Sequence, residues 1–175
     1  MQIEQGLNEI ADASFSPIAL RLATVFGSSP RIRFDVVINM LCGMAIAKKK
    51  VVLNSDGQAW RPHLYIEDVC EAFRCCIEWD YNEGRLMTLN VGHEDNNCKI
   101  LDVARIIQSK VKGCEMNFLG QSDVEDIDDL VKDRKIKDGE DKRTYRVSFD
   151  RIHKTLPGFK MLLAPLSTLL TLLKK

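Results

Sequence analysis

The sequence predicts an α/β fold with a mostly parallel sheet. Short apolar runs alternate along the chain with segments in which apolar residues recur every three or four positions. This alternation is typical of units in which a helix connects two parallel strands. The 175 residues, of which 45% are apolar and 29% charged, suffice for the core of one ordinary globular domain.

The first elements are a helix, a strand, a second helix and a second strand. Residues 3–11 carry apolar side chains at helical spacing, and the apolar run 18–26 predicts a buried strand that ends at a glycine. Residues 34–45 again have helical spacing, and the lysines at 48–50 suit the negative end of that helix. The β-branched run 51–53 predicts the next strand.

The middle of the chain continues the alternation. Residues 54–57, Asn-Ser-Asp-Gly, predict a hairpin or a tight loop. Asp68 and Glu71 stand three positions apart, as in a capping box, and we expect them to start a helix over 69–77. Residues 88–91 then predict a buried strand that ends at another glycine.

The last third mixes regular elements with a polar stretch. Residues 100–111 predict an amphipathic helix and 116–119 a further strand. The polar residues 121–142 predict a solvated loop or a short helix. We expect a last strand at 145–147 and a short helix at 149–156.

Charge and hydropathy exclude several classes of function. Lys plus Arg number 25 and Asp plus Glu number 25, so the chain lacks the positive field that nucleic acids and anionic membranes attract. The most apolar stretch, 161–173, has 13 residues, whereas a membrane-spanning helix needs about 20. The N-terminus has neither the basic start nor the apolar core of a secretory signal. We therefore expect a cytoplasmic protein with no nucleic-acid and no membrane partner.

Six cysteines and three histidines are the candidate redox groups and soft metal ligands. No Cys-x-x-Cys pair occurs, and no histidine has metal-ligand spacing from a cysteine. The carboxylates of 121–142 lack the glycine of an EF-hand-like loop, which favours a solvated face over calcium binding. We expect free thiols, no metal and no thiol redox activity.

Four segments, in a fixed order, resemble the motifs of one known family. Residues 21–27, Arg-Leu-Ala-Thr-Val-Phe-Gly, are similar to its Arg-x-x-Asn-Val-Tyr-Gly, and residues 56–69 resemble its Gly-Asp-Gly-x-x-x-Arg-Asp-x-x-x-Val-x-Asp-Val signature. Leu-Asn-Val-Gly at 89–92 and Asp-Lys-Arg-Thr-Tyr-Arg at 141–146 are similar to two later segments. The family is that of the extended short-chain dehydrogenases/reductases, which act on nucleotide sugars with NAD or NADP. It includes UDP-glucose 4-epimerases and sugar dehydratases.

The resemblance implies a fold, a domain division and a function. Over residues 1–160 it implies a partial Rossmann-type parallel sheet plus a small α/β substrate-binding subdomain, followed by an atypical apolar tail at 161–175. The family's Gly-x-x-Gly-x-x-Gly turn and its catalytic Tyr-x-x-x-Lys do not occur in the sequence. The chain is thus expected to be the nucleotide-sugar-binding C-terminal region of an NAD(P)-dependent epimerase or dehydratase, beginning just after the catalytic lysine. We assign no catalytic residue and expect no activity from the chain alone; NAD or NADP belongs to the complete enzyme.

Arg61 is the leading candidate for contact with substrate. In the resemblance it contacts the diphosphate of a UDP-sugar or similar nucleotide sugar, and a guanidinium can bind phosphate oxygens through two N–H groups. The alternative is a surface arginine paired with Glu67 or Asp68.

Two further candidates for the diphosphate come from other segments. Arg143 lies in the last matching segment, and Lys142 or Arg134 could take its place. Thr24 stands where the family often has an asparagine, and its hydroxyl offers a single donor. Arg21, inside an apolar strand, is interpreted as structural, with a carboxylate partner or an exposed head.

Six more positions follow from the resemblance. Leu22 and Ala23 would lie near the nicotinamide, although they are equally well explained as ordinary residues of a buried strand. The helix along the nucleotide and the strand beside its base would contribute, mostly through backbone groups, Val37, Asn39, Val52 and Asn54.

A second hypothesis belongs to another class of protein, a non-catalytic module that binds a nucleotide sugar or a partner chain. Strands that a complete sheet would cover leave unpaired edges, and such edges favour association. We therefore also expect either self-association or a complementary N-terminal half as partner.

Overall fold

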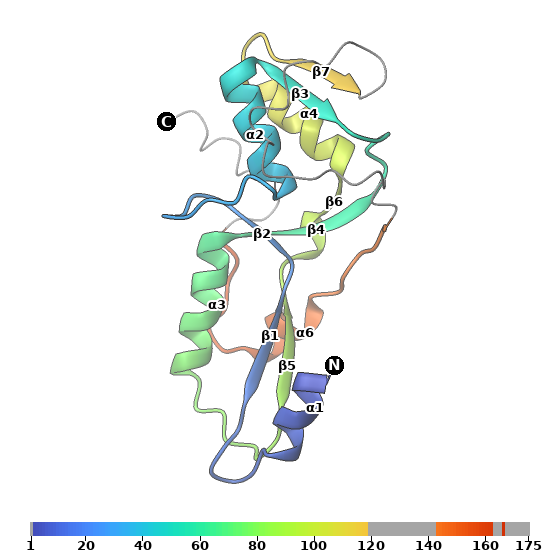
Figure 1. Cartoon of the computed structure of the whole chain (residues 1–175). Coiled ribbons are helices and arrows are strands. Elements are labelled where there is room, and N and C mark those ends of the chain that lie inside the picture. The colour runs from blue at the N-terminus through green and yellow to red at the C-terminus, as the bar shows by residue number, and fades with distance from the viewer. Residues whose placement is uncertain (1, 119–142, 163–165, 167–175) are drawn as a thin grey trace.

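The structure is a computed structural model that describes residues 2–118, 143–162 and 166 (Figure 1). Among these residues, three of the four strand pairs are parallel, which confirms the predicted α/β class. The elements are, in chain order, α1 (Gln2–Glu9), β1 (Ile18–Leu22), β2 (Thr24–Phe26), α2 (Val37–Lys48), β3 (Lys50–Leu53), β4 (Trp60–Tyr65), α3 (Ile66–Glu78), β5 (Met87–Val91), the 3₁₀ turn η1 (Glu94–Asn96), β6 (Asn97–Lys99), α4 (Ile100–Lys110), β7 (Glu115–Phe118) and α6 (Asp150–Thr155).

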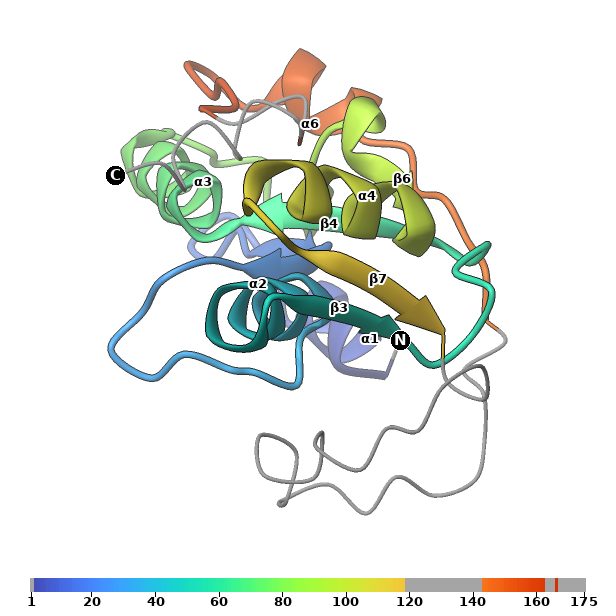
Figure 2. The ribbon, with the colours of Figure 1, turned by 90° about the horizontal axis from the view of Figure 1, so that it is seen from above.

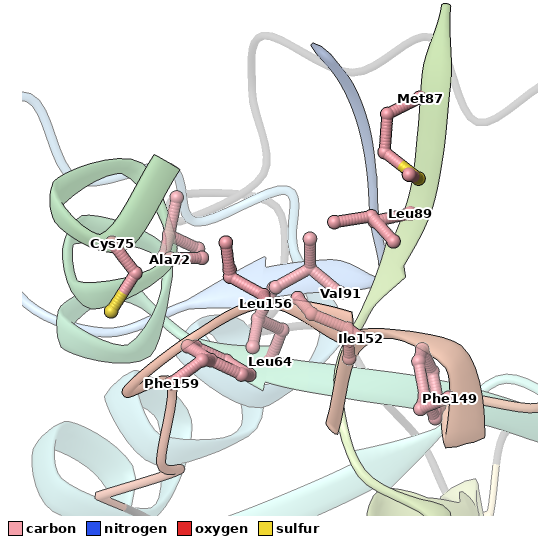
Figure 3. Packing of buried hydrophobic residues seen from close by; sticks show 11 residues of the cluster. Leu64, Ala72, Cys75, Met87, Leu89, Val91, Phe149, Ile152, Leu156 and Phe159 are labelled. Carbon is pink, nitrogen blue, oxygen red and sulfur yellow. The ribbon is translucent and has the colours of Figure 1, made fainter. Parts of the chain in front are cut away.

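β1 and β5 form a parallel pair in register from Ile18 opposite Met87 to Leu22 opposite Val91. Helix α3 precedes β5 in the chain and lies beside the pair, with α6 also nearby (Figure 1). The apolar residues of α3 recur at helical spacing, so that one stripe is buried against the strands. The resulting core includes Leu64, Val69, Ala72, Cys75, Leu89, Val91, Phe149, Ile152, Leu156 and Phe159 (Figure 3).

A second parallel pair, β3 with β7, carries the other core. Helices α2 and α4 pack against this pair and against each other (Figure 2). Helix α2 ends at Lys48, and Lys49 turns the chain with a left-handed φ of 53° before β3 begins. The buried residues of this core are Phe26, Ile38, Leu41, Ala45, Val51, Leu53, Val103, Ala104, Ile107 and Leu166.

A three-stranded sheet of order β2–β4–β6 links the two cores. At Ala23 the backbone N–H still donates to the carbonyl of Val91, at 3.2 Å. From Thr24 on, the chain pairs with β4 instead, in parallel, so it passes from one sheet to the other within a few residues. β4 in turn pairs antiparallel with β6.

Several predicted elements need correction. The predicted strand 18–26 is two strands, because its halves pair with different partners. Of the two alternatives predicted for residues 54–57, the loop is confirmed and the hairpin is wrong, since β3 pairs with β7. Residues 145–147 are not a strand, although the Tyr145 N–H donates to the Trp60 carbonyl at 3.3 Å. The sequence pattern does not predict the strands β4 and β6.

The start of α3 also differs from the prediction. The helix begins at Ile66, and Asp68 lies in its first turn, fully buried. The Asp68 carboxylate accepts a hydrogen bond from the backbone N–H of Leu162. Asp68 therefore connects α3 to the C-terminal segment instead of starting the helix.

The predicted tail at 161–175 is described only in part. Leu162 is exposed, whereas Leu166 is buried in the core between α2 and α4. The predicted stretch 121–142 lies outside the described residues, and the boundary at residue 160 stays a prediction. None of the helices in the described part of the chain has the length and apolar character needed to cross a membrane.

Candidate functional site

A pocket of about 330 Å³ lies where β1 and β5 end. Ligands of parallel sheets bind at the carboxyl ends of the strands, because the loops that follow them leave a crevice there. Here the crevice forms because the chain changes sheets at Ala23. The pocket is lined by Arg21, Leu22, Ala23, Thr24, Pro62, Asn90, Tyr145, Val147 and Phe149.

Residues 143–149, called the strap below, form one wall of this pocket with Tyr145, Val147 and Phe149. The strap has no regular secondary structure, so its peptide groups need other partners. Near its start, the backbone N–H of Trp60 donates to the Thr144 hydroxyl at 3.1 Å.

Side chains from β5, η1 and β6 hold the rest of the strap. Asn90 donates from Nδ2 to the Ser148 carbonyl at 3.1 Å. Glu94 accepts the Phe149 N–H at 2.7 Å. The Asn97 carboxamide accepts from the Val147 N–H at 2.9 Å and donates to the Val147 carbonyl at 3.1 Å.

Arg61 lies against the strap from β4. Its Nη1 donates to the carbonyl of Trp60 at 2.8 Å and to the carbonyl of Arg143. Its guanidinium carbon is 5.3 Å from the ring centroid of Tyr145, within the range of a cation–π contact. Neither arginine lines the pocket, and Arg143 meets Arg61 through its backbone carbonyl. The structure thus brings Arg61 and Arg143, predicted from segments far apart in the sequence, into contact behind the Tyr145 wall.

Three predicted residues line the pocket itself. Leu22 and Ala23 lie at the end of β1, and Thr24 starts β2 opposite His63 of β4. Leu22, at the end of β1, is 41% exposed. These positions form a continuous stretch of backbone along the pocket.

The remaining predicted positions lie elsewhere, around α2 and β3. Asn39 is 9% exposed and uses its amide for the scaffold, accepting from the Gly27 N–H and donating to the Arg33 carbonyl, each at 3.0 Å. Val37 packs against the α2–α4 core, Val52 is buried in β3, and Asn54 is exposed after that strand. The structure does not bring these four residues to the pocket.

Sequence reasoning did not select several residues that build the site. Asn90 lies in the matching segment 89–92, near the end of a predicted strand, and Tyr145 lies in the matching segment 141–146. Both positions could have been selected from the sequence for that reason. Pro62 follows Arg61 directly. Asn97 stands in a polar stretch with no motif and offered no such signal.

Arg21 matches its prediction as a structural residue. Its guanidinium forms two bonds to the Glu4 carboxylate, at 2.7 and 2.5 Å, and its side chain is 54% exposed. This pair joins α1 to β1. Hydrogen bonding with Arg21 lowers the pKa of Glu4.

His63 is fully buried beside the pocket-lining Thr24 and Pro62, and neither ring nitrogen has a hydrogen-bond partner among the described residues. Burial, and to a smaller degree the charge of Arg61, lowers its pKa to about 4. The neutral ring meets the ring of Phe26 edge to face, with the centroids 6.5 Å apart. His63 does not line the pocket and serves as a core residue.

The six cysteines are free thiols, and burial raises the pKa of the Cys42 thiol to about 11. Within residues 2–118, 143–162 and 166, no three His, Cys, Asp or Glu side chains lie together in a way that could hold a metal ion.

Comparison with protein families gives one match. The model described as "NAD dependent epimerase/dehydratase family" matches residues 1–92, which is more than half of the chain. The matched part includes β1 to β5 and hence most of the pocket.

Several solved structures share the fold of this chain. UDP-glucuronic acid 4-epimerase from Bacillus cereus, in complex with UDP-glucuronic acid and NAD, is 24% identical, with a TM-score of 0.62 over 89% of this chain and 43% of that chain. MoeE5 in complex with UDP-glucose and NAD is 20% identical, with a TM-score of 0.61 over 90% of this chain and 45% of that chain.

A third structure, dTDP-glucose 4,6-dehydratase from Bacillus anthracis in complex with NAD, is 20% identical, with a TM-score of 0.52 over 78% of this chain and 37% of that chain. At these identities the likeness is one of fold. The chain spans less than half the length of the structures that it matches.

Proposed function

Since this chain belongs to the NAD dependent epimerase/dehydratase family, we propose that it is the nucleotide-sugar-binding region of an NAD(P)-dependent sugar epimerase or dehydratase. The observation that carries the proposal is the contact of the Arg61 guanidinium with Tyr145, which lines the pocket at the carboxyl ends of β1 and β5. The fold shared with enzymes in complex with UDP-sugars supports the same substrate class.

The diphosphate of a nucleotide sugar carries about two negative charges, and guanidinium groups match phosphate oxygens in both charge and shape. Arg61 is held by contacts to two backbone carbonyls and one ring, so little side-chain entropy is lost when a phosphate binds. In this proposal the Arg143 side chain contacts the same diphosphate from the start of the strap. Thr24 lines the pocket and offers a hydroxyl to the same ligand.

The other predicted contacts belong to the nucleotide end. In this proposal Val37, Asn39, Val52 and Asn54 contact the nucleotide through backbone groups. The hydrogen bonds of the Asn39 amide to Gly27 and Arg33 support a backbone contact over a side-chain one, because both ends of the amide are already used.

Leu22 and Ala23 suit the nicotinamide end of the cofactor, since they present an apolar strand end to the pocket. The rest of NAD or NADP has no matching residues here, because the sequence has no Gly-x-x-Gly-x-x-Gly turn to bind the pyrophosphate. In the family the bound dinucleotide exchanges hydride with the sugar. Without Tyr-x-x-x-Lys, the sequence offers no acid–base pair for that chemistry, so we assign no catalytic step to this chain.

The alternative, a non-catalytic module that binds a nucleotide sugar or a partner chain, is favoured by one observation. Within the described residues β1 pairs with β5 alone, and the nearby α1 has no buried residue. The open edge of β1 and the exposed α1 could bind a second copy of the chain or a complementary N-terminal half. We propose residues 1–160 as the unit that such a partner completes, with 161–175 as a separate tail.

The test is titration calorimetry of the purified chain with UDP-glucose, beside an activity assay with NAD and UDP-glucose. We expect heat of binding from UDP-glucose, and neither UDP-galactose nor reduced cofactor above background. A folded chain that binds no UDP-sugar would refute the proposed substrate class. Robust turnover would overturn the proposal that the chain has no catalytic set of its own.

A further inference from the structure

We propose that Asn97 is the positioning residue of this pocket, which holds the strap so that Tyr145 and Val147 keep their places in the wall that faces the nucleotide sugar. The inference rests on the proposed function and assigns a role to a residue outside the four matching segments. Asn97 does not touch the pocket itself. Its effect on a ligand must therefore act through the strap.

The side chain of Asn97 replaces a neighbouring strand. It is 6% exposed, and its Oδ1 accepts the Val147 N–H while its Nδ2 donates to the Val147 carbonyl. A carboxamide that faces one residue in this way offers the same donor and acceptor as a paired β-strand. The same Nδ2 also donates to the Glu94 carbonyl at 3.1 Å, which fixes the orientation of the amide.

The backbone of Asn97 connects to another wall of the pocket. In the β4–β6 pair, Asn97 stands opposite Pro62, and Pro62 lines the pocket. Val147, which the side chain holds, lines it as well. One buried residue therefore sets the distance between the β4 wall and the strap wall.

The held residue lies in the middle of the strap, two positions after Tyr145 and two before Phe149. The Arg61 contacts to Tyr145 and to the Arg143 carbonyl require the first half of the strap to stay against β4. These two hydrogen bonds between the Asn97 side chain and Val147 are called the clamp. Loss of the clamp leaves the N–H and the carbonyl of Val147 without these partners. Tyr145 and Val147 would then be displaced from the pocket wall.

The test uses Asn97→Asp in the full chain. Aspartate keeps the shape and the acceptor for the Val147 N–H, but it places a carboxylate oxygen against the carbonyls of Val147 and Glu94. At a temperature where the variant is folded, we expect the affinity for UDP to fall about tenfold, the equivalent of one to two hydrogen bonds. We also expect the amides of Val147 and Phe149 to exchange hydrogen at least about tenfold faster.

The control is Asn82→Asp, the same chemical change at an exposed position between α3 and β5, which should leave both UDP affinity and strap exchange unchanged. Faster strap exchange with unchanged UDP affinity overturns the positioning role. Unchanged strap exchange in Asn97→Asp overturns the clamp. A wild-type chain that does not bind UDP overturns the proposed function instead, so the two failures are distinguishable.

Discussion

The Nη1 of Arg61 donates a hydrogen bond to the carbonyl oxygen of Arg143, a residue 82 positions further along the chain. The same nitrogen donates to the carbonyl of Trp60, and the guanidinium lies over the ring of Tyr145. A single side chain thus joins β4 to the strap. Arg61 has a structural contact in addition to its proposed ligand contact, and the two roles can be measured separately.

Replacement of Arg61 by alanine should weaken UDP-glucose binding about tenfold to a hundredfold, because a charge-assisted hydrogen bond is lost. Arg61→Lys should restore part of the affinity, since an ammonium keeps the charge without the planar fork. Loss of the bonds to Trp60 and Arg143 should lower the free energy of unfolding by about 1 kcal/mol. Calorimetric titration and denaturant unfolding measure the two effects.

The control for Arg61 is Arg105→Ala. Arg105 lies on α4, exposed and 3.7 Å from Asp102, and it does not line the pocket. An exposed ion pair of this kind contributes little, so both affinity and stability should stay near those of the wild type. Unchanged affinity with reduced stability in Arg61→Ala would leave Arg61 as a structural residue alone.

His63 should make the fold sensitive to acid. Its pKa is about 4 in the folded chain against an ordinary value of 6.5, so between these values the unfolded chain binds a proton that the folded chain does not. The contribution of neutral His63 to stability is therefore complete above about pH 6.5. It falls as the pH drops toward 4, by up to about 3 kcal/mol.

His63→Leu tests this dependence, because leucine has a similar volume and no titratable group. The variant should be at least as stable as the wild type at pH 7.5, since two unpartnered buried nitrogens are removed. Urea unfolding at several pH values should show a smaller loss of stability between pH 6.5 and 4 than in the wild type. Parallel pH profiles for the two proteins would show that His63 does not carry the effect.

Gly92, directly after β5, should not tolerate a side chain. A Cβ at this position would lie 2.5 Å from the ring of Phe149, and the ring is buried within the core. Gly92→Ala should therefore lower stability by about 1 to 3 kcal/mol and disturb the pocket wall that Phe149 forms. Thermal melts provide the measurement.

The matched control for Gly92 is Gly6→Ala in α1, where a Cβ would meet no atom within 4 Å. Alanine favours the helix over glycine, so this variant should be more stable by about 0.5 to 1 kcal/mol. Gly92→Ala with a wild-type melting temperature would mean that Phe149 moves freely, contrary to its position in the core.

The chain should associate in solution. On the outer side of α3, Phe73 is 51% and Ile77 82% exposed, four positions apart on one helical stripe. Apolar side chains grouped in this way favour contact with another chain. Light scattering coupled to size exclusion should show dimers or larger species.

The double variant Phe73→Ser with Ile77→Ser should shift that distribution toward the monomer. Leu162→Ser, which removes an exposed apolar side chain outside α3, should not. A wild-type chain that is a monomer with a cooperative melt would argue against the partner and for a self-sufficient module.

Elements with strong local patterns could be predicted from the sequence. Helices α2 and α4 and strands β3, β5 and β7 lie within three residues of their predicted bounds, because periodic apolar residues report directly on the buried face. The division at Ala23 could not be predicted in this way. An apolar run shows that a strand is buried, but the partner strand is chosen by residues that lie far along the chain, here Leu89 and Leu64.

By itself, the sequence determined the α/β class and the family, because each is written in a contiguous pattern or motif. The tertiary structure decided which residues form the walls of the pocket and what holds the strap. Asn97 and Val147 are 50 positions apart, and no sequence pattern predicts that they are in contact. Hydrogen bonds between such residues depend on packing distance and orientation, which exist only after both cores have formed.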